Sequence, residues 1–286
     1  MADVENHSDS NIVQAGKRPR GSGPILILAF LFVSATFLAW YFTWFGRGLS
    51  DADISKYLRD EKSPRHVQHA LLQVQERIER GDPSARKWYP EVILLSQNSE
   101  TEFRLTAAWL MGFDNRSPEF HDALNKLVHD GEPIVRRNAA LALVRFNDNS
   151  GREELLAVLR PYVVKAPFTG TITSTLHEGA AISRGALLAR IEGESSKDVE
   201  VRSPLPGRIN QVLRPNGSQV STEDDLLTLN SDEESIWEAL RGLAFVGVAN
   251  DVDVIRSYAN SNDSSARVKQ QAEVTAKAIT TRSNQK

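Results

Sequence analysis

One short motif occurs twice in the chain, and this duplication constrains the fold more than any other feature. The segment 164–172 (VKAPFTGTI) matches 201–209 (VRSPLPGRI) at an offset of 37, and after one inserted residue the match continues at an offset of 38. Proline and glycine recur every few residues between alternating Val, Ile and Thr, which is typical of short β-strands. Two such halves bury their apolar faces against each other. We therefore expect a small two-fold β domain over 162–230.

The repeated pattern V-x-[AS]-P-x-x-G-x-I, followed by G-x-x-I/V and L-x-x-I/L, resembles that of the biotinyl/lipoyl domains. The resemblance implies a β-sandwich of two interleaved halves. In carrier members of the family, a lysine at the tip of the hairpin between the halves is the attachment site for biotin or lipoate. Lys197 is the only lysine in the corresponding linker here, 192–201.

Lys197 is therefore the candidate cofactor-binding residue, but its register is off by one. The resemblance places the carrier lysine eight residues before the proline of the second motif, whereas Lys197 lies seven before Pro204. Neither the Met-Lys-Met of biotin carriers nor the Asp-Lys-Ala of lipoyl carriers is present. We expect no cofactor and an ordinary solvated turn at this position. A lipoyl- or biotin-type carrier modified on Lys197 stays open as the alternative.

The segments on either side of this domain are helical and also repeat. Residues 103–110 (FRLTAAWL) match 135–142 (VRRNAALA) at an offset of 32. Small alanines let neighbouring helices approach, while larger apolar side chains fill the space between them. These repeated segments resemble HEAT repeats. The resemblance implies a stack of helix pairs with an extended protein-binding surface. The alternative is an irregular helical bundle with no binding role. Arg136, Arg137 and Trp109 are the exposed candidates for contact with a partner. Each could equally serve packing between the repeats, and of the three Trp109 is the one we expect in the core.

The helical pattern is interrupted by the β domain and then resumes. Residues 151–160 resemble the first helix of a repeat, and 232–246 resemble its partner. We therefore expect the β domain to be inserted in the turn between two paired helices, where a repeat protein tolerates insertion best.

The segment 24–45 (PILILAFLFVSATFLAWYFTWF) is apolar, carries no charge, and is long enough to cross a hydrocarbon core of roughly 30 Å. Trp40, Tyr41 and Trp44 gather at its end, as is typical of a headgroup layer. We expect an uncleaved transmembrane helix rather than a signal peptide. Basic residues at 17, 18 and 20, just before this segment, favour a cytoplasmic N-terminus with the rest of the chain outside the cytoplasm. The expected location is a bacterial inner (cell) membrane with the bulk in the periplasm.

The resemblance extends in part to the periplasmic adaptor, or membrane-fusion, proteins of efflux pumps and type I secretion. In those proteins too, a single N-terminal membrane anchor is followed by a lipoyl-like domain. A long helical hairpin usually separates the two halves of that domain, whereas only a short linker does so here. The resemblance therefore covers the predicted anchor and the β domain alone.

Composition and motifs exclude several functions. The chain has no cysteine, so it has no disulfide, thiolate nucleophile or Cys-ligated metal, and its net charge of −3 gives no case for nucleic acid. No Walker loop, G-x-S-x-G elbow, G-x-G-x-x-G turn or H-E-x-x-H zinc motif occurs. His66 and His69 share a helical face but lack further ligands, so we expect no metal site. These observations favour a protein that is not an enzyme.

The predicted organisation is a membrane-anchored α plus β chain. It comprises a disordered tail (1–23), a transmembrane helix (24–46), HEAT-like α-solenoid repeats (47–161), a biotinyl/lipoyl-like β-sandwich (162–230) and C-terminal helices completing the repeats (231–286). The expected function is a non-enzymatic adaptor or scaffold that binds a protein partner, within an envelope transport or secretion assembly or as a homo-oligomer.

Overall fold

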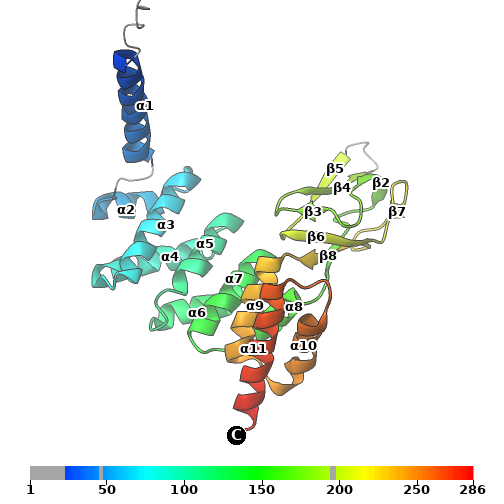
Figure 1. Cartoon of the computed structure of the whole chain (residues 1–286). Helices are drawn as coiled ribbons and strands as arrows, with labels where there is room; N and C mark the ends of the chain where they lie inside the picture. The colour runs from blue at the N-terminus through cyan, green and yellow to red at the C-terminus, as the bar shows by residue number, and fades with distance from the viewer. Residues whose placement is uncertain (1–22, 45–47, 194–197, 286) are drawn as a thin grey trace, which may run out of the picture. The chain divides into compact units, whose positions relative to one another are not determined.

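The structure is a computed structural model that describes residues 23–44, 48–193 and 198–285 (Figure 1). The chain forms two compact units, Met1–Gly48 and Leu49–Lys286, which are described separately. The expected disordered tail lies, apart from Gly23, outside the described residues. Eleven α-helices and two open antiparallel sheets make the described part a mixed α/β fold.

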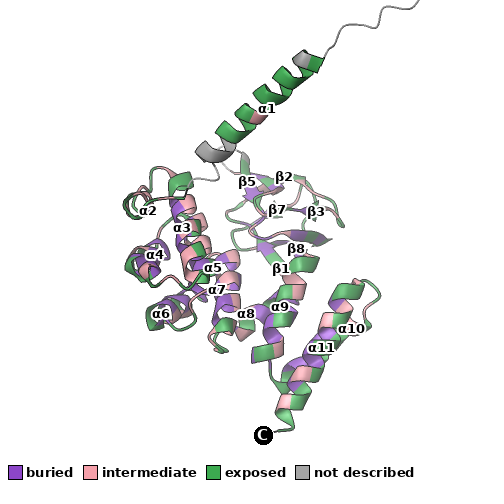
Figure 2. Cartoon of the chain, turned by 60° about the vertical axis from the view of Figure 1, so that its left-hand side comes forward, coloured by how far each residue is buried: buried purple, intermediate pink, exposed green. Residues whose placement is uncertain are grey.

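The described residues of the first unit form one helix, α1 (Gly23–Trp44), and the predicted transmembrane span over 24–46 is not supported. Among the described residues, no helix combines the length and the apolar character needed to cross a membrane. Nearly all of the side chains described in α1 are exposed (Figure 2). The fold class is therefore corrected to a mixed α/β chain with an N-terminal helix.

The helices of the second unit pack as successive pairs. Within its described residues the pairs are α2 with α3, α4 with α5, α6 with α7, α8 with α9, and α10 with α11. The second helices of these pairs also pack against one another in order, from α3 to α11 (Figure 1). The bounds are α2 (Asp51–Leu58), α3 (Pro64–Glu79), η1 (Pro83–Trp88), α4 (Tyr89–Leu95), α5 (Thr101–Met111), α6 (Pro118–Leu127), α7 (Pro133–Arg145), α8 (Arg152–Val158), α9 (Glu233–Val246), η2 (Ala249–Asp251), α10 (Val252–Asn260) and α11 (Ala266–Ser283).

Repeated arginines tie each pair to the next. The Arg104 guanidinium donates to both carboxylate oxygens of Asp130, at 2.7 and 3.0 Å, and to the carbonyls of Asn98 and Ser99 at 2.9 Å. Arg136 occupies the equivalent position in α7 and donates to Glu154 at 3.0 Å and to two carbonyls of its own preceding loop. The 32-residue repeat in the sequence is therefore a repeat of inter-pair contacts. Each arginine orders the loop before its helix and holds the following pair.

The β domain consists of two four-stranded antiparallel sheets. Their strand orders are β1-β8-β6-β3 and β5-β4-β2-β7, and each strand of the first half has its counterpart four strands later. Both sheets contribute to one apolar core that includes Ile172, Ile191, Ile209 and Leu229. The bounds are β1 (Tyr162–Lys165), β2 (Gly170–Thr175), β3 (Ala181–Ile182), β4 (Leu187–Glu192), β5 (Asp198–Arg202), β6 (Gly207–Val212), β7 (Gln219–Val220) and β8 (Asp225–Ser231).

Two pairs of equivalent glycines explain why both halves of the β domain carry glycine at the same positions of the motif. A Cβ on Gly170 or Gly207 would overlap the carbonyl oxygen of the neighbouring strand, so both positions require the close backbone approach that glycine permits. Gly179 and Gly217 adopt φ of 80° and 84° in equivalent turns, a region that side chains disfavour. The sequence duplication thus becomes a two-fold arrangement of strands and turns.

The β domain leaves the helical array after α8 and returns to it at α9. Its first and last strands pair directly, with Tyr162 opposite Leu229, so the two ends of the insertion lie side by side. Helices α8 and α9 accordingly remain packed partners although the whole β domain separates them in sequence (Figure 1). Beyond α9, Arg152 at the start of α8 forms a bidentate pair with buried Asp251, which extends the contact to the last helix pair.

Replacing Arg104 with Ala should lower the unfolding free energy by about 3 kcal/mol, because Asp130 keeps only 9% side-chain exposure and loses its partner. Burial raises the pKa of Asp130, but hydrogen bonds from Arg104 and from the Glu132 backbone outweigh it, so the net pKa lies below its ordinary value of 3.8. This contribution is present above about pH 5 and is lost as the pH falls through the lowered pKa. Urea unfolding between pH 3 and 7 measures both effects.

The matched control is Arg116→Ala, which removes an exposed arginine from the loop before α6 and should change the unfolding free energy by less than about 0.5 kcal/mol. Equal losses in the two variants would contradict the inter-pair role of Arg104.

Candidate functional site

The predicted cofactor residue, Lys197, lies outside the described residues. The flanking strands are described, and β4 pairs with β5 up to Glu192 opposite Asp198. The linker therefore connects two adjacent antiparallel strands.

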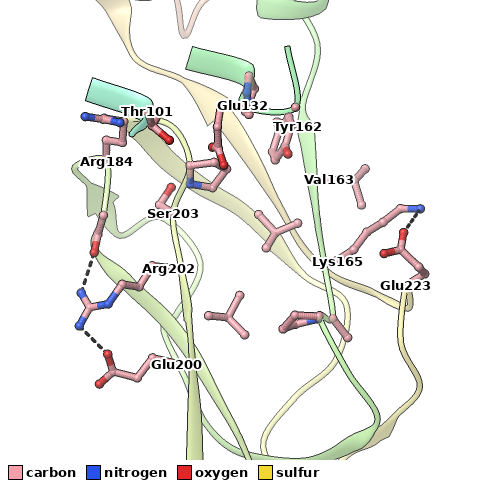
Figure 3. Close-up of a pocket in the computed structure, with 18 of the residues that line it drawn as sticks. Thr101, Glu132, Tyr162, Val163, Lys165, Arg184, Glu200, Arg202, Ser203 and Glu223 are labelled. Atoms are coloured by element: carbon pink, nitrogen blue, oxygen red, sulfur yellow. Dashed lines mark hydrogen bonds and ion pairs between the residues drawn. The ribbon is translucent and has the colours of Figure 1, made fainter. Parts of the chain in front are cut away.

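A cleft of about 960 Å³ lies where the β domain meets the helical array (Figure 3). One side is formed by the starts of α5 and α7, at Thr101 and Pro133. The other side is formed by β1 and β5, which are edge strands of the two sheets. The two halves of the repeat contribute equivalent residues: Val164 and Val201, Lys165 and Arg202, Ala166 and Ser203, Pro167 and Pro204, and Gly185 and Glu223.

The cations of this cleft are all neutralised by neighbouring carboxylates. Lys165 pairs with Glu223 at 3.3 Å, and Arg202 pairs with Glu200 at 2.5 Å (Figure 3). Arg184 pairs with Glu102 and thereby connects the β domain to α5. Because its charges are satisfied internally, the cleft offers no free cation to an anionic ligand. Its ion pairs instead connect the two parts of the second unit.

A second hollow, of about 240 Å³, opens on the face formed by α5, α7 and α9. Trp109, Leu141 and Phe245 surround it, one from each helix, and we call this surface the α5–α7–α9 face. Trp109 is 41% exposed and Phe245 is 66% exposed. Small residues create the hollow, namely Gly112, Ala142 and Gly242, all of which line it. The small residues that let these helices pack closely therefore also leave the depression in the surface.

Exposed apolar side chains gather on the second helices of the pairs. In the described helix pairs of the second unit, four of the five exposed large apolar residues lie on second helices, and Leu94 on α4 is the exception. The four are Leu72, Trp109, Phe245 and Val274. Scattered apolar residues on a surface are ordinary. Of these four, Trp109 and Phe245 lie around the same hollow.

The residues singled out from the sequence have different roles in the structure. Trp109 is exposed rather than buried in the core. Its ring makes an edge-to-face contact with the ring of Phe113, with 4.8 Å between the ring centroids. Arg136 is used in the contact between pairs. Arg137 is only 6% exposed and donates to Ser231 at 3.3 Å, because β8 and its exit to α9 cover this side of α7. Burial lowers the pKa of Arg137, although the nearby carboxylates of Glu154 and Asp232 favour its charged form.

Phe245 was not recognised from the sequence. Its place in α9 follows the buried Leu240 and Leu243 and precedes the buried Val246, so it reads as one more apolar residue of an amphipathic helix. Only the three-dimensional packing shows that this ring points away from the core. The sequence signal that could have identified Phe245 is the apolar stripe along α9, which is wider than the part of the helix surface that the core can cover.

In the part of the chain that the structure describes, no group of three or more His, Asp or Glu side chains is placed to hold a metal ion. His121 contacts Asp148 at 2.6 Å, and Ser150 donates to the same carboxylate at 2.6 Å. The carboxylate therefore lies between the serine and the histidine. A serine nucleophile requires the histidine beside it, so this cluster is a loop contact.

Comparison with known families supports the helical part. The family model described as HEAT repeats matches residues 90–168, which confirms the prediction of HEAT repeats for that segment. No curated protein matches the chain.

Two solved structures were compared with the chain. A single-chain, multi-domain long-chain acyl-CoA carboxylase is 23% identical, with a TM-score of 0.24, over 41% of this chain and 12% of the carboxylase. The aligned part thus spans about an eighth of the carboxylase. An engineered protein is 15% identical, with a TM-score of 0.43, over 80% of this chain and 78% of its own length. Both likenesses are too distant to bear on function.

Truncating the exposed aromatics should leave stability nearly intact. Phe245→Ala should change the unfolding free energy by less than about 0.5 kcal/mol, and Trp109→Ala by about 1 kcal/mol through its contact with Phe113. The matched control is Phe103→Ala, which removes a fully buried ring of α5 and should cost about 3–5 kcal/mol. Urea denaturation checks all three. A loss at Phe245 as large as that at Phe103 would show that this ring stabilises the fold.

Proposed function

We propose that the chain is a non-enzymatic scaffold that binds a protein partner through the α5–α7–α9 face. The observation that carries this proposal is the cluster of Trp109, Leu141 and Phe245 around an open hollow. Aromatic side chains dominate the binding energy of protein interfaces because they bury large areas at a small entropy cost. HEAT-type arrays present such surfaces as a rigid, extended face. The neutral overall charge balance leaves nucleic acid without support.

The test uses the full chain purified from its native source, with co-purifying proteins quantified by mass spectrometry. Phe245→Glu should remove the partner, since it places a charge at the centre of an interface that excludes water, and charge is depleted from such cores. Leu94→Glu is the matched control, because Leu94 is similarly exposed, at 64%, but lies on a first helix. It should leave the partner bound. Loss in both variants, or in neither, would contradict this face as the binding surface.

We also infer that the β domain is of the biotinyl/lipoyl type and serves as a docking module without a cofactor. The two-fold order of its strands and the equivalent glycine turns support this inference. The absence of both carrier tripeptides around Lys197 supports the unmodified state. The domain would then contribute a rigid shape and its ion pair to α5, through Arg184 and Glu102, rather than a swinging arm.

The purified chain should carry no adduct of lipoyl or biotinyl mass, because the register of Lys197 is one residue from that of the carriers. Mass spectrometry of the whole chain, with Lys197→Arg as the control, decides the question. An adduct of lipoyl or biotinyl mass that disappears in Lys197→Arg would establish the carrier function instead.

A further inference from the structure

Two arginines on the α5–α7–α9 face stand outside the ion pairs that hold the described part of the second unit together. Arg145 and Arg241 both line the hollow and are exposed, and neither forms an ion pair among the described residues. Most arginines that hold this unit together do form one, including Arg104, Arg136 and Arg152. Two cations that form no ion pair among the described residues therefore lie beside the exposed aromatic rings of this face.

Both guanidinium groups are held in place by aromatic rings. The Arg145 guanidinium carbon lies 4.5 Å from the ring centroid of Phe113, and that of Arg241 lies 4.6 Å from the centroid of Trp237. Arg145 also donates to the carbonyl of Gly112 at 3.4 Å. Stacking of this kind restrains a long side chain in advance, so an incoming carboxylate meets a cation that has less entropy to lose. The planar donor set stays available to a carboxylate.

The remaining charge near the hollow does not cancel this pair. Glu238 is the single carboxylate among the lining residues, against two cations. Burial and the neighbouring Glu234 carboxylate raise the pKa of Glu238 by more than the nearby Arg241 and Arg267 guanidinium groups lower it, so its charged form is less favoured than that of an ordinary glutamate. The rim of the hollow therefore carries a net positive charge.

The size of the hollow decides between a small molecule and a side chain. Its volume of about 240 Å³ is below the roughly 300–1,000 Å³ typical of small-molecule pockets. It suits one large apolar side chain, and the surrounding Trp109, Leu141 and Phe245 provide the contact ring that excludes water around such an anchor.

We propose that the α5–α7–α9 face binds a protein segment in which a large apolar residue is flanked by aspartate or glutamate. The apolar residue enters the hollow, and its acidic neighbours pair with Arg145 and Arg241. This inference rests on the proposed function and specifies the class of partner. The charge pairs select acidic segments and speed the encounter, while the apolar anchor supplies most of the affinity.

The experiment pans a displayed library of random peptides against the immobilised full chain. Enriched peptides should carry an apolar residue with Asp or Glu nearby. Synthetic copies are then titrated by fluorescence anisotropy against the full chain and its variants. Arg145→Glu with Arg241→Glu should weaken binding about tenfold or more, as expected when two rim attractions become repulsions. Raising the salt concentration should weaken binding to the wild type and have less effect on the double variant.

The matched control is Arg256→Glu, which reverses an exposed arginine on α10 and should leave the affinity unchanged. If loss of the contact between Arg145 and the Gly112 carbonyl disturbs the fold of the double variant, the single variant Arg241→Glu is measured in its place. Weakening by Phe245→Ala without any effect of the two arginine reversals would overturn the acidic partner and leave the proposed function standing. Binding that is indifferent to Phe245→Ala would overturn both. Absence of enriched peptides, or self-association through this face in sedimentation, would also overturn the acidic partner.

Discussion

The pairing of β1 with β8 is the contact on which the rest of the second unit depends. An inserted domain separates its host helices unless its two ends lie close together, and here the first and last strands of the insertion are hydrogen-bonded neighbours. Helices α8 and α9 can therefore pack as one repeat although the β domain lies between them in sequence. The array remains continuous from α2 to α11, and the face that crosses α5, α7 and α9 exists only because of this continuity.

The β domain was the most predictable part of the chain, for a local physical reason. Each half carries its own glycines at places where a Cβ would collide with the next strand, and its own turns of positive φ. Such requirements appear in the sequence as fixed residue types at fixed spacing. The strand order then follows, because two equivalent halves bury their apolar faces only by interleaving.

The helical part was predictable in kind but not in detail. Repeated Arg and Ala positions indicated helix pairs, yet they could not say which apolar residue lies outside. Trp109 was expected in the core and is exposed, since its side of α5 faces the open hollow. Arg137 was expected to be exposed and is buried, since β8 covers it from nearly a hundred residues away in sequence. The transmembrane span predicted over 24–46 is not supported either, since no helix among the described residues is long and apolar enough to cross a membrane.

The small residues of the hollow have a consequence for how this surface can evolve. Gly112 already approaches Ala142 closely, and a side chain on Gly242 would press against Leu155 in the adjacent helix. Any enlargement that fills the depression would also push neighbouring repeats apart. Stability and recognition therefore place demands on the same few positions. Changes in specificity are confined to the ring of larger side chains and cations above them, where substitution leaves the stacking of the helices undisturbed.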